Sequence, residues 1–254
     1  MPAQTDLDRL SVGAFTSRCQ GAMIPVSNRF SYFPASPLNE EEVKDYVEDP
    51  VASLPPALVS GLPLVCIALV PYLERPNGKG KDVKAGEVVC FERPPEKRQA
   101  PFTVTVSDPQ TTLLFAIKDR AVADYHYHFY NAIAGLAVDH AGDEQRGRFL
   151  SLLREELHLR VHGEVDQDGW HLKQSLMRRQ TNLRRETKAF QEYARQSFID
   201  TLTLYLHGIC CDIDVEPGPR QLPSRYLRKR LVLLEELYPP PEGYVVFPED
   251  VAKT

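Results

Sequence analysis

The chain is poor in the residues that mark secreted domains and small metal-binding domains. Its 254 residues include only five cysteines, three methionines and one tryptophan. The number of cysteines is odd and no CxxC pair occurs, so the sequence predicts neither a disulfide framework nor a zinc finger. The N-terminus lacks a basic region followed by an apolar one, and unpaired thiols are typical of a reducing compartment. We therefore expect a cytoplasmic protein.

Long apolar runs and common catalytic motifs are also lacking. The longest apolar run, Leu62 to Val70, is interrupted by Pro63 and is too short to cross a bilayer, so no membrane contact is expected. The sequence contains no GxxxxGK[ST], GxGxxG, GxSxG or HExxH pattern. The chain therefore lacks the motifs by which nucleotide-binding proteins, serine hydrolases and zinc proteases are usually recognised. No cofactor is predicted.

Charge is close to balanced overall but uneven along the chain. The formal net charge of −5 argues against a protein that coats nucleic acid with its whole surface. Residues 1–60 carry eight acids and four bases, whereas residues 173–195 carry seven bases and two acids. Residues 220–230 add five bases and no acid. Such asymmetry indicates either a partner surface or two parts of the chain that dock on each other.

Proline content and apolar spacing divide the chain into three regions. Residues 1–61 are proline-rich and predict an irregular arm with one short helix after Asn39. Residues 62–118 carry strand-like runs separated by turns. No helix of crossover length lies between these runs, which predicts a small antiparallel sheet. Residues 119–254 predict helices. We expect an α+β fold in which residues 62–118 and 119–254 form one integrated domain.

One apolar stripe dominates the helical region. Apolar residues recur at steps of three, four and seven between residues 172 and 205, which predicts a single helix of about 35 residues, roughly 50 Å long. A helix over residues 149–161 precedes it across a seven-residue turn, so the sequence predicts a long antiparallel helical hairpin. The stripe consists of Leu172, Leu176, Leu183, Phe190, Ala194, Phe198, Thr201 and Tyr205.

The helix face opposite this stripe is the most basic in the sequence, and a second basic group opens the last helix. Basic side chains a turn or two apart bind a phosphate backbone or an acidic protein surface, and they also pair within a chain. We expect these side chains to bind a polyanion or a partner protein. They are Arg178, Arg184, Arg185, Lys188, Arg225, Arg228 and Lys229.

A metal site is the alternative that uses the histidines. His126, His128 and Asp139 have the spacing of the zinc ligands in JAMM-type metalloproteases, but Leu136 and Phe129 replace the serine and proline expected beside them. On a strand the two imidazoles would share one metal, whereas on a helix they lie about 200° apart. Zinc is the metal that such a site would hold.

Two weaker candidates remain. Glu155, His158 and His162 would stack on one helix face as a ligand set, but that face is opposite the apolar one and is better interpreted as solvated. The adjacent pair Cys210 and Cys211 offers a nucleophile, although two small core residues at a helix end explain it better.

Taken together, the patterns predict a non-enzymatic interaction or scaffold protein. We expect it to be a subunit of a larger assembly, with a partner protein on the basic helical face. Two alternatives stay open. The first is a metal-dependent hydrolase that uses His126, His128 and Asp139, and the second is a nucleic-acid-binding protein.

Overall fold

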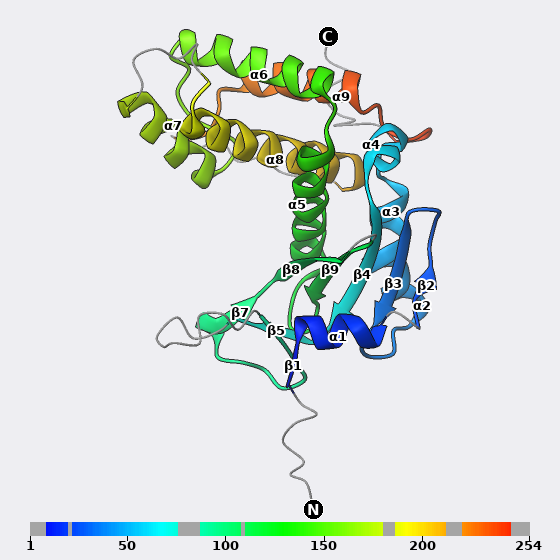
Figure 1. The fold of residues 1–254 in the computed structure, drawn as a ribbon. Coiled ribbons are helices and arrows are strands. Elements are labelled where there is room, and N and C mark those ends of the chain that lie inside the picture. The colour runs from blue at the N-terminus through cyan, green and yellow to red at the C-terminus, as the bar shows by residue number, and fades with distance from the viewer. Residues whose placement is uncertain are drawn as a thin grey trace, which may run out of the picture. The chain divides into compact units, whose positions relative to one another are not determined.

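The computed structural model describes residues 9–19, 22–75, 87–107, 110–179, 186–211 and 220–244. The chain divides into two compact units (Figure 1). The sheet unit comprises Met1–Ala52 and Leu62–Ala132, and the helical unit comprises Ser53–Gly61 and Ile133–Thr254. Strands lie in the first unit and most helices in the second, so the predicted α+β class is confirmed.

The sheet unit holds two sheets. The smaller is antiparallel, with the order β1 (Arg9–Ser11), β6 (Val88–Cys90), β5 (Tyr72–Glu74) and β7 (Gln99–Ala100). The larger has the order β2 (Ile24–Pro25), β3 (Phe30–Pro34), β4 (Leu64–Val70), β9 (Gln110–Ala116) and β8 (Phe102–Ser107). In the larger sheet β3 and β9 both lie parallel to β4, whereas β2 and β8 are antiparallel to their neighbours.

The prediction of a purely antiparallel sheet is wrong for the larger sheet, because β4 is parallel both to β9 and to β3, which comes from the N-terminal region. The connection from β3 to β4 contains the helices that a parallel crossover needs. These are α2 (Glu40–Val43), a π-helical turn (Lys44–Glu48), α3 (Asp49–Ala52) and α4 (Pro56–Gly61). The N-terminal region is therefore not irregular, since it also supplies α1 (Val12–Cys19) and three strands.

The predicted helix start at Asn39 is confirmed in detail. Its side-chain oxygen accepts a hydrogen bond from the Glu42 N–H at 2.8 Å. The Glu42 carboxylate in turn accepts one from the Asn39 N–H at 2.8 Å, which completes a capping box.

Helices cover both faces of the larger sheet. On one face α1 packs on Ala68, Val70, Leu114 and Ala116 of β4 and β9. On the other face lies the first half of α5 (Val122–His140), which is helical as the spacing predicts. The Tyr125 ring of α5 meets the Phe115 ring of β9 with their centroids 5.1 Å apart. Successive side chains of β9 point to opposite faces of the sheet, so β9 contributes to an apolar layer on each face.

The helical unit contains α6 (Asp143–His158), α7 (Gln167–Arg179), α8 (Lys188–Cys210) and α9 (Ser224–Leu237). The prediction of one continuous helix over residues 172–205 is wrong, since a new helix begins after Thr187. The Thr187 hydroxyl accepts a hydrogen bond from the Phe190 N–H at 3.2 Å, as an N-cap residue does. The hairpin is formed by α7 and α8, and not by α6 and one long helix.

The two parts of the predicted stripe bury themselves against the same core. Gly169 near the start of α7 lies against Asp200 of α8, while Lys173 meets the same carboxylate as Tyr193, so the two helices are antiparallel. Leu176 and the stripe residues of α8 are buried. Folding back buries both apolar faces, which a single straight helix would leave exposed in part.

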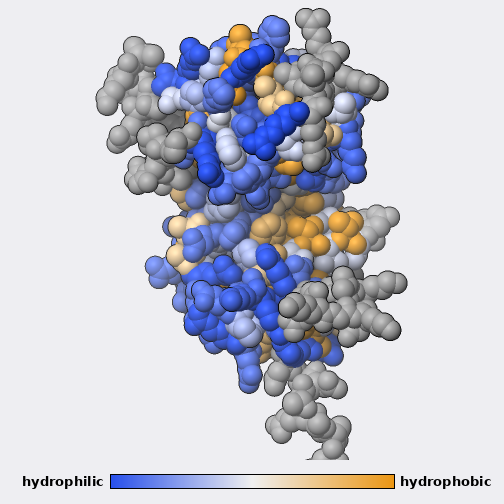
Figure 2. Space-filling view, turned by 90° about the vertical axis from the view of Figure 1, so that its left-hand side faces the viewer, coloured by the Kyte–Doolittle hydropathy of each residue, from blue (hydrophilic) through white to orange (hydrophobic). Residues whose placement is uncertain are grey.

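The described part of the chain has no helix that is both long and apolar enough to cross a membrane. The face shown in Figure 2 is mostly hydrophilic, with its largest hydrophobic area to the right of centre. Cys19, Cys66 and Cys90 are buried thiols in the sheet unit. Burial raises the pKa of Cys19 to about 12 and that of Cys66 to about 11, so neither offers a thiolate at neutral pH.

A glycine after α6 permits the turn into α7. Gly163 has φ of +84°, and a Cβ there would lie 2.0 Å from the backbone oxygen of Gln221. We expect Gly163→Ala to lower the free energy of unfolding by about 2 kcal/mol, because it combines a left-handed backbone with an overlap. Gly135→Ala in α5, where nothing lies within 4 Å, should instead raise it by about 0.5–1 kcal/mol. Urea unfolding measures both, and equal midpoints would contradict the prediction.

Candidate partner-binding groove

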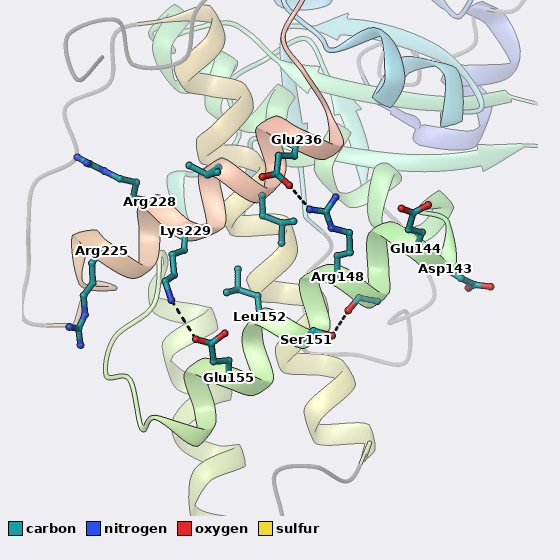
Figure 3. A pocket seen from close by; sticks show the side chains of 13 residues that line it. Asp143, Glu144, Arg148, Ser151, Leu152, Glu155, Arg225, Arg228, Lys229 and Glu236 are labelled. Atoms are coloured by element: carbon teal, nitrogen blue, oxygen red, sulfur yellow. Dashed lines mark hydrogen bonds and ion pairs between the residues drawn. The ribbon is translucent and has the colours of Figure 1, made fainter. Parts of the chain in front are cut away.

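The surface with the most distinctive chemistry in the described residues lies between α6 and α9. The two helices run antiparallel, because Arg148 pairs with Glu236 while Glu155, further along α6, pairs with Lys229 at 3.4 Å (Figure 3). Each helix buries one apolar side, with Leu153 on α6 and Leu234 on α9 fully enclosed. Their outer sides form the walls of an open groove.

The groove has a volume of about 930 Å³ and draws its lining from these two helices alone. Seven residues of α6 and six of α9 line it. They are Asp143, Glu144, Gly147, Arg148, Ser151, Leu152 and Glu155, with Arg225, Arg228, Lys229, Val232, Leu233 and Glu236.

Charge in the groove is sorted along its length. Arg225 and Arg228 lie at one end and Asp143 and Glu144 at the other (Figure 3). The ion pairs Arg148–Glu236 and Lys229–Glu155 cross the space between the two helices. Leu152, Val232 and Leu233 add an apolar part, and Val232 is 47% exposed. The groove therefore offers an apolar contact between a basic end and an acidic end.

The basic end is partly organised by an aromatic ring. The Arg225 guanidinium lies 4.6 Å from the centroid of the Tyr226 ring and donates a hydrogen bond to its hydroxyl at 2.9 Å. Lys229 lies 5.9 Å from the same ring. Arg228 is exposed and pairs with no acid among the described residues. Its guanidinium is thus available to an incoming carboxylate.

A buried ion cluster lies directly behind the groove. Glu156 follows Glu155 on α6, and Arg230 follows Lys229 on α9. Both side chains face inward and bind each other, with Arg230 Nε 3.0 Å from Glu156 Oε1. Arg230 Nη1 also donates to Glu164 at 2.8 Å. Glu164 further accepts from Lys173 Nζ at 2.9 Å and from the Tyr193 hydroxyl. The cluster joins all four helices α6 to α9.

The cluster's electrostatics keep the Glu164 carboxylate ionised. Burial would by itself raise the pKa of Glu164, but the charges of Arg230 and Lys173 outweigh it and lower the pKa to about 2. These side chains are at most 2% exposed, so no substrate reaches them in this structure. We interpret the cluster as the device that fixes α9 against α6, and so fixes the width of the groove.

A third buried acid in the helical unit, Asp200, has the opposite character to Glu164. Asp200 Oδ1 accepts a hydrogen bond from Gln196 at 2.7 Å, while Oδ2 finds no partner among the described residues. Burial raises the pKa of Asp200 to about 7, and the nearby carboxylates of Asp166 and Glu164 add to the effect. The pKa values of Asp200 and Glu164 therefore shift in opposite directions, because only Glu164 has cations beside it.

The basic residues predicted from the sequence do not form one continuous face. Arg178 is exposed on α7, and Lys188 is 89% exposed at the start of α8, where it pairs with Glu192 at 3.8 Å. Arg184 and Arg185 lie outside the described residues. Because the predicted long helix is two helices, the shared face on which that prediction rested is interrupted. The three predicted residues of α9 are the ones that meet in a groove.

The metal-site alternative loses its geometric basis. His126, His128 and Asp139 all lie on α5, which is a helix and not a strand. His126 Nε2 is 2.8 Å from the Asp45 backbone oxygen, and the His128 ring packs on Phe102 with centroids 5.7 Å apart. Asp139 lies on the order of 16–20 Å further along the helix than the two histidines, at 1.5 Å per residue. It is bound by Arg195 at 3.0 Å. One metal cannot bind all three.

Of the two weaker candidates, the Glu155, His158 and His162 set separates, and the cysteine pair lies at the end of α8. Glu155 and His158 are exposed on α6, but the helix ends at His158 and Arg160 has φ of +52°, so His162 is not on the same face. Cys210 is the last residue of α8. Cys211 is the C-cap residue, and its N–H donates a hydrogen bond to the His207 backbone oxygen at 2.9 Å. Both cysteines therefore lie at a helix end.

Sequence reasoning missed the α6 half of the groove. Arg148 and Glu144 were overlooked because their charges are ordinary on a solvated helix, and only the pairing with α9 gives them a place in the groove. The available signal was Val232, an apolar residue that falls outside the helical stripe of Leu227, Leu231, Leu234 and Tyr238. Comparison with protein-family models, with curated proteins and with solved structures finds no match for this chain.

Proposed function

We propose that this chain is a non-enzymatic interaction protein whose α6–α9 groove binds a segment of a partner protein. The observation that carries the proposal is the exposed apolar floor at Val232 between a basic and an acidic end. Apolar contact supplies affinity in such surfaces, while the two charged ends select the direction in which a segment binds.

The groove specifies the chemistry of that segment. A complementary segment carries acidic residues at the end that meets Arg225 and Arg228, and basic residues at the end that meets Asp143 and Glu144. Leucine or a similar side chain between them would cover Val232. An amphipathic helix presents such residues at i, i+3, i+4 and i+7, and helix-in-groove binding is a common mode of recognition.

A partner protein fits this groove better than nucleic acid does. The lining contains four basic residues and four acidic ones, so its formal charge is zero. A phosphate backbone that followed the groove from Arg228 would meet Glu155 and Glu236, and then Asp143 and Glu144. Affinity for nucleic acid depends on a net release of counterions, which this balanced surface does not provide.

Site-specific photo-crosslinking tests the proposal. A photoreactive residue at position 232, in cells that produce the protein, is expected to give one discrete polypeptide adduct. The variant R225E/R228E should reduce the adduct by at least about tenfold, because a loss of about 1.4 kcal/mol is enough for that change.

The matched control is R178E/K188E, which makes the same change of charge on exposed residues outside the groove. This variant should keep the adduct. Absence of any adduct, equal loss in both variants, or an adduct removed by nuclease would each overturn the proposal. The nuclease result would favour a nucleic-acid-binding protein instead.

A further inference from the structure

One edge of the larger sheet lacks the features that usually prevent strands from pairing between molecules. The edge strand β8 has six residues, Phe-Thr-Val-Thr-Val-Ser, with no charge and no proline. On its apolar side, Val104 is 40% and Val106 is 73% exposed. Natural edge strands are normally shortened, charged, bulged or covered.

The opposite edge of the same sheet is protected. Strand β2 has two residues, Ile24 and Pro25, and the proline offers no N–H. Among the residues that the structure describes, this sheet thus has one edge that is blocked and one that no strand covers. The two edges of the same sheet therefore differ, so the lack of protection is a property of β8 and not of the whole sheet.

The hydrogen-bond pattern shows which groups of β8 point outward. The Ala116 N–H donates to the Pro101 oxygen at 3.0 Å, and the β8–β9 register places Thr103 opposite Leu114. In an antiparallel pair the inward-bonding residues alternate, so Thr103, Thr105 and Ser107 bond to β9. The N–H and C=O groups of Phe102, Val104 and Val106 therefore point away from the sheet.

We propose that β8 is the dimerisation edge of this protein and that its occupant is β8 of a second copy. Two copies related by a two-fold axis at Val104 would place Val104 opposite Val104, and Phe102 opposite Val106. All three residues have outward backbone groups, so this register satisfies them on both copies. The pairing joins two five-stranded sheets into one of ten strands.

The strand's own composition selects a second copy as its partner. A two-fold axis at Val104 pairs β8 with its own sequence, so a charge at Val104 would face the same charge and a charged strand would face one of the same sign. The absence of charge on all six residues removes that repulsion. The alternation of apolar β-branched residues with threonine is also what an edge-pairing strand requires.

Sedimentation velocity of the full chain over a concentration series tests the dimer. We expect a dissociation constant on the order of 10–100 µM, because a six-residue edge buries less than the roughly 800 Å² per partner of a standard interface. Val104→Lys should raise it at least about tenfold, since two lysines then face each other. Ile24→Lys, a matched change on the blocked edge, should leave it unchanged.

A mixing experiment tests the register. Val104→Lys and Val104→Glu should each be monomeric alone, whereas an equimolar mixture should regain the dimer because lysine then faces glutamate. A monomer at about 500 µM wild type, well above the expected dissociation constant, would overturn the proposal. So would a dimer that Val104→Lys leaves intact, or a mixture that stays monomeric. Circular dichroism of each variant confirms that the sheet unit is folded.

Discussion

Replacing Arg230 with methionine is expected to destabilise the helical unit by about 3–5 kcal/mol. Arg230 is completely buried and bonds to both Glu156 and Glu164. Without it Glu156 loses the cation that it binds, and Glu164 keeps only Lys173. Two buried carboxylates would then be left with one cation, Lys173, in a space from which water is excluded. The midpoint of urea unfolding followed by circular dichroism at 222 nm measures the loss.

Two variants separate this cause from a general effect of substitution. Arg228→Met, on the exposed side of the same helix, should change the stability by no more than about 0.5 kcal/mol. The double variant R230M/E156L should regain at least half of the loss, because it removes the unpaired carboxylate and leaves the Glu164–Lys173 pair intact. Wild-type stability in Arg230→Met would show that the carboxylates are not held by this cation.

Replacing Asp200 with asparagine is expected to stabilise the protein at high pH and to change it little at low pH. The pKa of Asp200 rises from 3.8 to about 7 on folding, so the folded state binds a proton that the unfolded state has released. Wild-type stability therefore falls as the pH rises from about 4 to about 7. About three pKa units correspond to roughly 4 kcal/mol, which asparagine recovers above pH 7 because it never ionises.

Thermal unfolding at pH 5 and pH 8 measures the effect. Glu192→Gln, a change at an exposed carboxylate of α8 that does not act on Asp200, should keep the wild-type dependence on pH. Glu164 works in the opposite direction, since its pKa is lowered from 4.5 to about 2 and its contribution is lost only as the pH falls through that range. Equal pH dependence in wild type and Asp200→Asn would refute the assignment of a buried, protonated Asp200.

Local signals in the sequence predicted local structure well. The capping residue Asn39, the apolar spacing of α5 and the strand runs that become β4, β8 and β9 all lie where their patterns indicate. The pairing of those strands could not be obtained in the same way. Both neighbours of β4 are parallel to it, and one of them, β3, has five residues that include Pro34 and lie in the proline-rich region predicted to be irregular.

The break between α7 and α8 shows why periodicity alone is insufficient. Steps of three, four and seven continue through residues 176–190, and no glycine or proline interrupts them. A stripe that remains in phase is compatible with one straight helix and with two helices folded on each other. The choice depends on which arrangement buries more apolar surface, and that is a property of the whole unit.

The candidate groove was predictable only in part. The three basic residues of α9 were identified from their charge, whereas the acidic end and the apolar floor depend on α6 lying beside α9. Arg230 illustrates the limit, because the sequence places it among exposed bases and the structure buries it completely. A cation can be assigned to the core only when its carboxylates, here 66 and 74 residues away, are known to surround it.

The separation in sequence between Arg230 and its two carboxylates also bears on how the helical unit is completed during synthesis. Glu156 and Glu164 leave the ribosome long before Arg230 does, so a nascent chain has these carboxylates and no guanidinium to neutralise them. Closing α6, α7 and α8 around these two carboxylates without α9 would bury them with Lys173 as their one cation from the described cluster, which carries a desolvation cost. Arg230 therefore ties the packing of α9 to that of α6, α7 and α8, because its carboxylate partners also bind side chains of those helices.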